Sequence, residues 1–202
     1  MKIAGVILAG GAGLRLGGVD KAMVRLGGRP LLAWVCDALT PQVDGVVLSA
    51  NGDAARFAGF GLPVVGDEGP LAGPLGGVVA ALSWWAGQPD PPDAVAFAPV
   101  DTPFLPLDLV TRLGEAASTA PLGCAAARSK GRLHPTLALL AASARPQLRQ
   151  NLAKGELRLT EAIEALYPAI TDFDAETDDP FFNINRPEDL TAAERRLANW
   201  AL

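Results

Sequence analysis

The sequence has few of the residues on which several common kinds of site depend. It contains only two cysteines, Cys36 and Cys124, which form neither a CxxC pair nor a disulfide framework. This is typical of a protein of the reducing cytosol, and both residues are expected to be small core residues. His134 is the only histidine. Pro135 and the apolar residues that follow it favour a structural or substrate-lining role for His134 over that of a general base.

An excess of basic residues is also missing. The net charge is -5, whereas a general nucleic-acid binder is more often basic, so no nucleic-acid partner is expected. The first 30 residues nevertheless hold five basic side chains against one acidic side chain, Asp20. A basic segment within an acidic protein suits a small polyanion that binds locally. The five basic residues are Lys2, Arg15, Lys21, Arg25 and Arg29.

Signals for export or membrane insertion are absent as well. Residues 1–5 lack a signal-peptide pattern and lead directly into an apolar run. Residues 69–89 carry no charge, but Pro70, Pro74 and several glycines indicate a loop followed by a buried helix instead of a membrane span. We therefore expect a cytoplasmic protein without membrane contact.

Apolar runs alternate with longer amphipathic segments along the whole chain, which predicts a single α/β domain over residues 1–202. Its sheet is expected to be mostly parallel and flanked by helices on both faces. Strands are predicted at Ile3–Ala9, Val46–Ser49, Leu62–Val65, Ala94–Val100, Leu122–Ala127 and Thr136–Leu140. Helices are predicted at residues 30–39, 74–86, 106–117, 143–153, 159–166 and 187–200. Ligands in such sheets bind beyond the carboxyl ends of the strands, where loops 8–21, 67–77 and 101–104 are expected to meet.

The loop over residues 8–21 has the composition of a phosphate-binding loop. Its glycines allow backbone N–H groups to approach phosphate oxygens. Arg15 can hold two oxygens with its planar guanidinium, and Lys21 can place a point charge on a triphosphate. A tight turn between strand and helix would explain the glycines alone, but not Arg15, Asp20 and Lys21 within the same loop. The loop reads Leu8-Ala9-Gly10-Gly11-Ala12-Gly13-Leu14-Arg15-Leu16-Gly17-Gly18-Val19-Asp20-Lys21.

Two familiar phosphate motifs do not match this loop. A Walker A loop requires Gly-Lys-Ser/Thr, but Lys21 follows Asp20 and precedes Ala22. A dinucleotide-binding fingerprint requires a third glycine where Leu16 stands.

Three polar residues follow predicted strands at the ligand edge. Asp101 ends the strand 94–100, where a carboxylate could bind Mg²⁺ beside nucleotide phosphates or could cap the following helix. Asn51 and Asp67 follow the second and third strands, where either residue could serve a turn or a ligand.

Six segments, taken in order, resemble the nucleotidyltransferases that build nucleoside-diphosphate derivatives. Residues 17–21 are most similar to the molybdenum cofactor guanylyltransferase family. The chain departs from the family in having only Glu68 between Asp67 and Gly69. The segments are residues 8–21, Asn51, Asp67 with 69–73, Asp101–Phe104, His134–Leu139 and Asn183–Leu190.

The resemblance implies a Rossmann-like, GT-A-like nucleotidyltransferase fold and an enzyme that uses Mg²⁺. Asp101 matches the family's magnesium aspartate, and Arg15, Lys21 and Asp101 would carry catalysis. Asn183 and Asn185 would help to hold the pterin; on a strand, both amides would lie on one face. The residues implied to contact GTP are Leu8, Ala9, Gly10, Gly11, Gly13, Lys21, Asn51, Asp67 and Asp101.

The implied reaction joins GMP from GTP to the terminal phosphate of molybdopterin, or Mo-molybdopterin, and releases pyrophosphate. The N-terminal part would bind GTP, and the C-terminal part would contribute to the pterin site. In the resembled family the Gly10–Gly11 pair accompanies guanine, whereas cytosine-using relatives tend to carry alanine at the first glycine. The alternatives are a cytidylyl counterpart, a sugar-1-phosphate nucleotidyltransferase and a non-catalytic cofactor-binding adaptor. We expect a monomer that contacts cofactor-biosynthesis proteins and recipient molybdoenzymes transiently.

Overall fold

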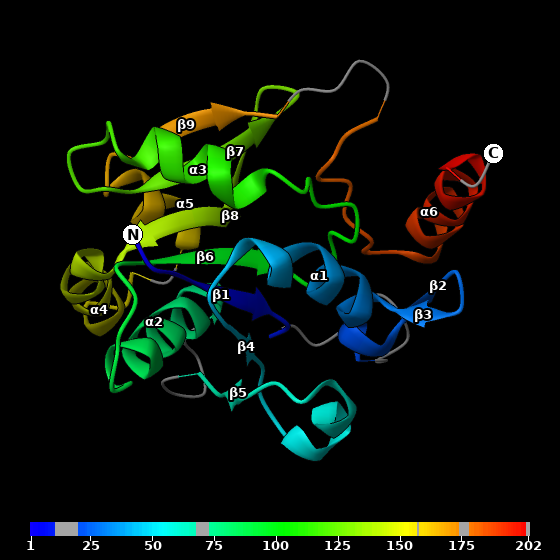
Figure 1. Ribbon diagram of the computed structural model, residues 1–202, viewed down its shortest axis with the longest axis horizontal. Helices are drawn as coiled ribbons and strands as arrows, with labels where there is room; N and C mark the ends of the chain where they lie inside the picture. The colour runs from blue at the N-terminus through cyan, green and yellow to red at the C-terminus, as the bar shows by residue number, and fades with distance from the viewer. Residues whose placement is uncertain (11–19, 68–72, 157, 174–177, 201–202) are drawn as a thin grey trace.

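The fold is built around one seven-stranded sheet (Figure 1). The computed structural model describes residues 1–10, 20–67, 73–156, 158–173 and 178–200, with side chains to residue 198; Gly11, Gly13 and Arg15 lie outside these ranges. The strand order is β5-β4-β1-β6-β8-β7-β9. The strands are β1 (Ile3–Leu8), β4 (Val46–Ser49), β5 (Val64–Val65), β6 (Ala94–Pro99), β7 (Ala125–Ser129), β8 (Arg132–Ala141) and β9 (Ala169–Asp172).

Six of these strands run in the same direction. β1 pairs in parallel with β4 and β6, β4 with β5, and β7 with β9. The seventh strand, β8, is reversed and pairs antiparallel with both β6 and β7. The mostly parallel sheet expected from the sequence is therefore confirmed. The carboxyl ends of β1, β4, β5 and β6 meet at one edge, and β8 begins at that edge because it runs in the opposite direction.

Helices cover both faces of the sheet because successive strand residues point to opposite faces. On β1, Ile7 packs into the cluster that contains α1 and α3, whereas Val6 packs into the cluster that contains α2, α4 and α5. In Figure 1, α1 and α3 lie in front of the sheet. The helices are α1 (Leu31–Leu39), α2 (Gly73–Ala86), α3 (Leu109–Ala117), α4 (Arg145–Ala153) and α5 (Leu159–Glu164).

A smaller apolar cluster joins the two ends of the chain beside the main sheet. The hairpin of β2 (Arg25–Leu26) and β3 (Arg29–Pro30) contributes Leu26, and helix α6 (Pro187–Trp200) contributes Ala193. Ile184 and Phe104 belong to the buried part of this cluster. Figure 1 shows α6 next to the hairpin and away from the sheet. The cluster holds the segment before α6 against the loop that follows β6.

Several sequence expectations need correction. The strand predicted at 122–127 lies at Ala125–Ser129, and that predicted at 62–65 is reduced to Val64–Val65. Strand β9 and the β2–β3 hairpin were not predicted. Asp101 caps no helix, because α3 begins only at Leu109. Asn183 and Asn185 are not on a strand, since residues 182–185 form no ladder with another described segment.

The remaining features are the short 3₁₀ helices, the two cysteines and the length and apolar content of the helices. Short 3₁₀ helices lie at η2 (Lys21–Met23), η3 (Thr40–Gln42), η4 (Ala54–Phe60) and η5 (Ala142–Ala144). Cys36 and Cys124 are free thiols, as predicted. Burial is the larger cause and the negative charge of Asp37 the smaller cause that raise the pKa of Cys36 to about 11. Within the described ranges, no helix has the length and apolar content that crossing a bilayer requires.

Candidate active site

A cavity of about 170 Å³ lies at the edge where the parallel strands end. Leu8 ends β1, Ser49 ends β4 and Pro99 ends β6, so three adjacent strands deliver their last residues to it. β1 lies between β4 and β6: the chain passes from β1 to β4 and β5 on one side and then crosses to β6 on the other side. The point where the strand order reverses in this way is the usual ligand position in such sheets. The lining residues are Leu8, Ala9, Gly10, Lys21, Ser49, Asp67, Pro74, Gly77, Pro99, Val100, Asp101 and Thr136.

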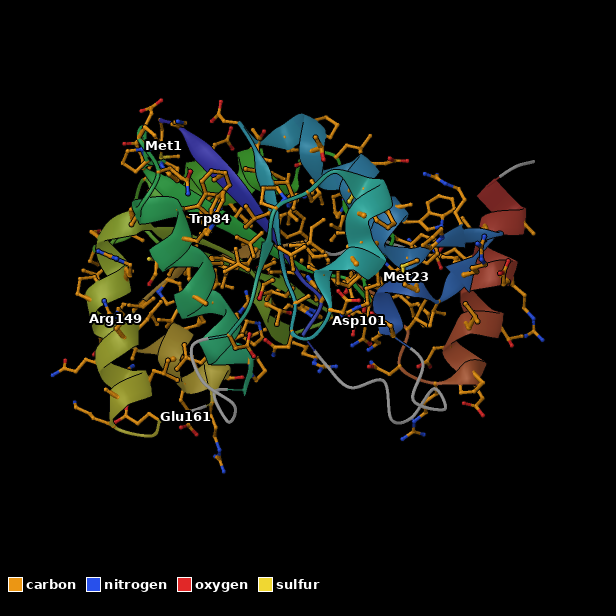
Figure 2. The ribbon with its side chains drawn as sticks, turned by 90° about the horizontal axis from the view of Figure 1, so that it is seen from below. Met1, Met23, Trp84, Asp101, Arg149 and Glu161 are labelled. Atoms are coloured by element: carbon orange, nitrogen blue, oxygen red, sulfur yellow. The ribbon has the colours of Figure 1, made fainter. Side chains whose placement is uncertain are left out.

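Lys21, Asp101 and Asn185 form the polar centre at one end of this cavity. The Lys21 Nζ donates to Asp101 Oδ2 at 2.5 Å and to Asn185 Oδ1 at 2.5 Å. The side chains of Lys21 and Asp101 are only 16% and 18% exposed. Figure 2 shows Asp101 near the centre of the molecule, close to Met23 of η2. Residues from the start, middle and end of the chain therefore converge on one charge centre.

The segment that carries Asn185 is tied to Asp101 through the backbone. The Ile184 N–H donates to the Asp101 carbonyl at 2.9 Å, and the Ile184 side chain is fully buried. The carboxylate of Asp189, in the first turn of α6, accepts from the N–H groups of Asn185 and Arg186. Asn185 is thus held in place from both sides. Neither Asn183 nor Asn185 lines the cavity, and Asn185 is connected to it through its hydrogen bond with Lys21.

Lys21 is positioned by a short turn that Arg56 anchors. Asp20 caps η2 by accepting from Ala22 N–H at 3.1 Å, and its other oxygen accepts from Arg56 Nε at 2.5 Å. Arg56 also donates to the carbonyls of Asn51 and Asp53, at 2.6 and 2.7 Å. One guanidinium therefore connects the Lys21 turn to the loop that follows β4.

Asn51 and Asp67 form a reciprocal pair beside the cavity. Asn51 Nδ2 donates to Asp67 Oδ2 at 2.7 Å, and Asp67 N–H donates to Asn51 Oδ1 at 2.9 Å. Asp67 lines the cavity, whereas Asn51 does not. The arrangement makes Asn51 a residue that orients Asp67, with one oxygen of the carboxylate occupied by the amide.

His134 lies near the start of β8 in a separate hydrogen-bonded group. Its Nε2 is 2.9 Å from Ser129 Oγ, which donates to Asp179 Oδ1 at 2.8 Å, and its ring packs edge-on against Phe181. Burial lowers the pKa of His134; Asp179 opposes this shift and Arg132 adds to it. Ser129 donates to Asp179 instead of transferring a proton to His134, so the group is not a nucleophile–base arrangement. The structural or substrate-lining role predicted for His134 agrees with this geometry.

The donors around Lys21 fit a hard divalent cation. Asp101 supplies a carboxylate and Asn185 an amide oxygen, and both already converge on the positive charge of the lysine ammonium. Mg²⁺ takes oxygen ligands of this kind and commonly uses one or two protein groups together with phosphates and water. Within the described ranges, no cluster of three or more His, Cys, Asp or Glu side chains is arranged to hold a metal. The chemistry of the donors thus suits a metal that arrives with a nucleotide.

Sequence reasoning gave no site role to three residues of this region. Arg56 and Ser49 stand in no recognisable motif, and Thr136 lines the cavity only because β8 is reversed. Of the residues implied by the resemblance, Leu8, Ala9, Gly10, Lys21, Asp67 and Asp101 do line one cavity. Gly11, Gly13 and Arg15 lie outside the described residues.

Comparison with known proteins agrees with this architecture. The family model of the MobA-like NTP transferase domain matches residues 5–168. The molybdenum cofactor guanylyltransferase of Cereibacter sphaeroides is 48% identical over 197 residues, covering 98% of each chain. That of Rhodopseudomonas palustris (strain BisB5) is 46% identical, covering 94% of this chain and 91% of the relative.

Solved structures show the same fold. Molybdopterin-guanine dinucleotide biosynthesis protein A from Archaeoglobus fulgidus superposes with a TM-score of 0.74 at 26% identity, covering 98% of this chain and 100% of that chain. The 2-C-methyl-D-erythritol 4-phosphate cytidylyltransferase from Thermus thermophilus has a TM-score of 0.69 at 22% identity, with 96% and 98% covered, and shows the fold alone. The chain therefore belongs to the MobA-like NTP transferases and, among them, to the molybdenum cofactor guanylyltransferase family.

Proposed function

We propose that the protein transfers GMP from GTP to the terminal phosphate of molybdopterin and releases pyrophosphate. The observation that carries the proposal is the convergence of Lys21, Asp101 and Asn185 at the end of a cavity formed by three parallel strands. The names of the relatives at 46–48% identity support the guanylyl assignment.

The chemistry requires alignment and charge neutralisation more than proton transfer. An oxygen of the molybdopterin phosphate forms a bond to the α-phosphorus of GTP, and the bond from that phosphorus to the bridging α–β oxygen breaks. A phosphate monoester is already nucleophilic at neutral pH, so no general base is needed. Lys21 can stabilise the phosphate charge as it shifts onto pyrophosphate, and Asp101 holds Lys21 in place until phosphate binds.

We propose that the enzyme uses Mg²⁺, with Asp101 as its protein carboxylate and Asn185 as a further oxygen ligand or as the partner of Lys21. When bound, the ion would neutralise phosphate oxygens during the transfer. Arg15, Gly11 and Gly13 remain proposed phosphate contacts, while Leu8, Ala9 and Gly10 line the nucleotide cavity. Asn183 remains a proposed pterin contact.

The working context is also a proposal. We infer a cytoplasmic monomer that receives and delivers its pterin through transient contacts with other cofactor proteins and recipient molybdoenzymes. Two free thiols are compatible with a reducing compartment. Size-exclusion chromatography with light scattering at working concentration checks the monomer, and a stable dimer would contradict it.

A pyrophosphate-release assay tests the proposed reaction. Purified protein is incubated with Mg²⁺ and molybdopterin in the presence of GTP or CTP, and the pterin product is identified by mass spectrometry. Molybdopterin-guanine dinucleotide is the expected product. A cytosine dinucleotide would support the cytidylyl alternative, and nucleotide binding without any pyrophosphate would support a non-catalytic adaptor.

A further inference from the structure

The buried hydroxyl of Ser129 connects the β7–β8 hairpin to the segment that precedes α6. Ser129 ends β7 and is 1% exposed. Its Oγ donates to Asp179 Oδ1 at 2.8 Å and lies 2.9 Å from His134 Nε2. These three residues do not line the cavity that Lys21 and Asp101 line. The hydroxyl therefore joins parts of the chain that are 50 residues apart, outside the nucleotide cavity.

The single hydrogen of the Ser129 hydroxyl fixes the direction of both hydrogen bonds. A carboxylate can only accept, so the hydroxyl hydrogen points to Asp179. The Ser129 oxygen then accepts from His134, which requires the proton of the neutral imidazole to be on Nε2. The His134 ring also packs edge-on against Phe181, with 5.0 Å between the ring centres. The three side chains thus form one hydrogen-bonded chain from His134 through Ser129 to Asp179.

Asp179 extends this contact to the backbone of its own segment. Its Oδ1 also accepts from Phe181 N–H at 2.9 Å, and its carbonyl accepts from Phe182 N–H at 3.2 Å and from Arg196 of α6 at 2.7 Å. The Phe181 side chain is buried. The start of the segment is therefore ordered around one aspartate, whose carboxylate Ser129 holds.

Asn183 lies between two fixed points of this segment. On one side, Phe181 is held through the Asp179 carboxylate. On the other side, Ile184 is fully buried and donates its N–H to the Asp101 carbonyl at 2.9 Å. Because only one residue separates Phe181 from Asn183, loss of the first fixed point would change the position of the Asn183 amide.

We propose that Ser129 is a positioning residue for the pterin: its hydroxyl holds Asp179 and thereby places Asn183 for contact with molybdopterin. This inference rests on the proposed function, in which Asn183 contacts the pterin. Asn185 has a separate anchor, since Asp189 accepts from its N–H at 2.8 Å. Removal of the Ser129 hydroxyl should therefore impair use of the pterin and leave the GTP cavity unchanged.

Steady-state kinetics of the intact enzyme test this role. Ser129→Ala leaves Asp179 and His134 each without one partner, so we expect KM for molybdopterin to rise about five- to tenfold while KM for GTP stays unchanged. Asp179→Ala should give the same pattern. Asp179→Asn keeps an accepting oxygen and should remain close to the wild type. Ser83→Ala in α2 is the matched control, because the Ser83 hydroxyl is also buried but has no partner among the described residues.

A double-mutant cycle separates positioning from general stability. If Ser129 acts through Asn183, adding Ser129→Ala to Asn183→Ala should raise KM for molybdopterin by less than about twofold. Two independent, multiplying increases would overturn the inference. A lower melting temperature of Ser129→Ala with wild-type KM values, or equal increases in KM for both substrates, would also overturn it. If Ser129→Ala does not fold, Asp179→Ala and Asp179→Asn decide.

The imidazole ¹⁵N signals provide a readout that does not depend on activity. His134 is the only histidine, so labelled protein gives one pair of ring signals. At about pH 7.5 the lowered pKa of His134 leaves the ring neutral, and the wild type should carry its proton on Nε2. Ser129→Ala should show a mixture of both tautomers, because Nε2 has lost its acceptor. A wild-type proton on Nδ1 would refute the direction of the hydrogen bonds and with it the proposal.

Failure of the proposed function is distinguishable from these outcomes. It would appear as wild-type protein that forms no guanine dinucleotide from GTP and molybdopterin. The positioning role would then fall with the proposed function, whereas the ¹⁵N signals would still report the contact between His134 and Ser129.

Discussion

Lys21 and Asp101 neutralise each other in an ion pair at 2.5 Å, and both are proposed to contact phosphate or metal during the reaction. Burial of both side chains strengthens the attraction between them relative to a surface pair. Either residue alone would be left as a poorly solvated charge.

Asp101→Asn is expected to lower the rate of GMP transfer by at least about 100-fold, because it removes the proposed metal carboxylate and the partner of Lys21. The measurement is pyrophosphate release as a function of Mg²⁺ concentration. Asp90→Asn, at an exposed side chain far from the cavity, serves as the control. Wild-type turnover by folded Asp101→Asn protein would refute this role.

Gly10 provides a second prediction for a single residue. It lines the cavity, and a Cβ on it would meet no atom of the described residues within 4 Å, so Gly10→Ala is expected to fold normally. The added methyl would instead take space from the nucleotide. We expect a higher KM for GTP and a narrower GTP/CTP ratio in kcat/KM, by about 1–3 kcal/mol.

Gly59→Ala is the matched control for Gly10→Ala, because position 59 is equally open and also exposed but lies outside the cavity. An unchanged nucleotide ratio in Gly10→Ala would place base selection entirely on other residues.

Among the elements, η2 and η4 depend on each other through Arg56. Its three hydrogen bonds join the turn that carries Lys21 to the loop that carries Asn51, and its guanidinium lies 4.3 Å from the centre of the Phe57 ring. Arg56 is a positioning residue, since it does not line the cavity.

Arg56→Met keeps an aliphatic stem over Phe57 and removes the three hydrogen bonds. We expect KM for GTP to rise about tenfold, with a smaller change in kcat, because two nucleotide-contacting segments lose their common anchor. Arg56→Lys should recover part of the loss by restoring the charge opposite Asp20. Steady-state kinetics decide between these outcomes.

Arg149→Met on α4 is the control for Arg56, because Arg149 is exposed and lies well away from Asp101 in Figure 2. If Arg56→Met changed only the melting temperature and left KM unaltered, the residue would be structural alone.

Over the whole molecule, a segment near the C-terminus contacts the turn near the N-terminus that carries Lys21. Asn185 meets Lys21 across 164 residues, and α6 packs on the β2–β3 hairpin through the small apolar cluster. The segment before α6 and the turn that carries Lys21 are therefore joined by a hydrogen bond, although they are far apart along the chain.

Because Asn185 contacts Lys21, Asn183→Ala and Asn185→Ala should differ in their effects on kcat/KM for GTP. Asn185→Ala is expected to lower kcat/KM for GTP about tenfold as well as impairing the pterin step, because Lys21 loses a partner. Asn183→Ala should affect the pterin step alone. Kinetics with each substrate varied in turn provide the measurement, and equal effects of the two variants on GTP would contradict the distinction.

Stability should depend on pH through the only histidine. Burial lowers the pKa of His134 below 6.5, so the unfolded chain takes up a proton that the folded protein does not as pH falls below that value. The contribution of His134 is thus fully present above pH 6.5 and is lost toward the lower folded pKa. Denaturant unfolding at about pH 7.5 and about pH 5.5 should show a smaller decrease for His134→Gln than for the wild type. An NMR titration midpoint above 6.5 would contradict the expected direction.

The sequence by itself determined the features that depend on neighbouring residues. Alternating apolar runs and amphipathic segments predicted the parallel sheet with helices on both faces, because side-chain periodicity is a local property. The loops after β1, β5 and β6 could be assigned to the ligand edge, since carboxyl ends of parallel strands share one edge. The role of Asp101 depended on the family resemblance, because a lone aspartate after a strand also suits a helix cap.

Tertiary structure alone decided which groups meet. The reversal of β8 brings Thr136 to the cavity, and β9 is a strand only because β7 offers its free edge as a partner. Arg56, Ser49 and Gly77 acquire their places through hydrogen bonds and packing between elements that no local pattern records. Asn185 reaches Lys21 because Ile184 is buried beside the loop after β6. Such contacts depend on how distant segments are packed together, and that packing is set by the whole chain.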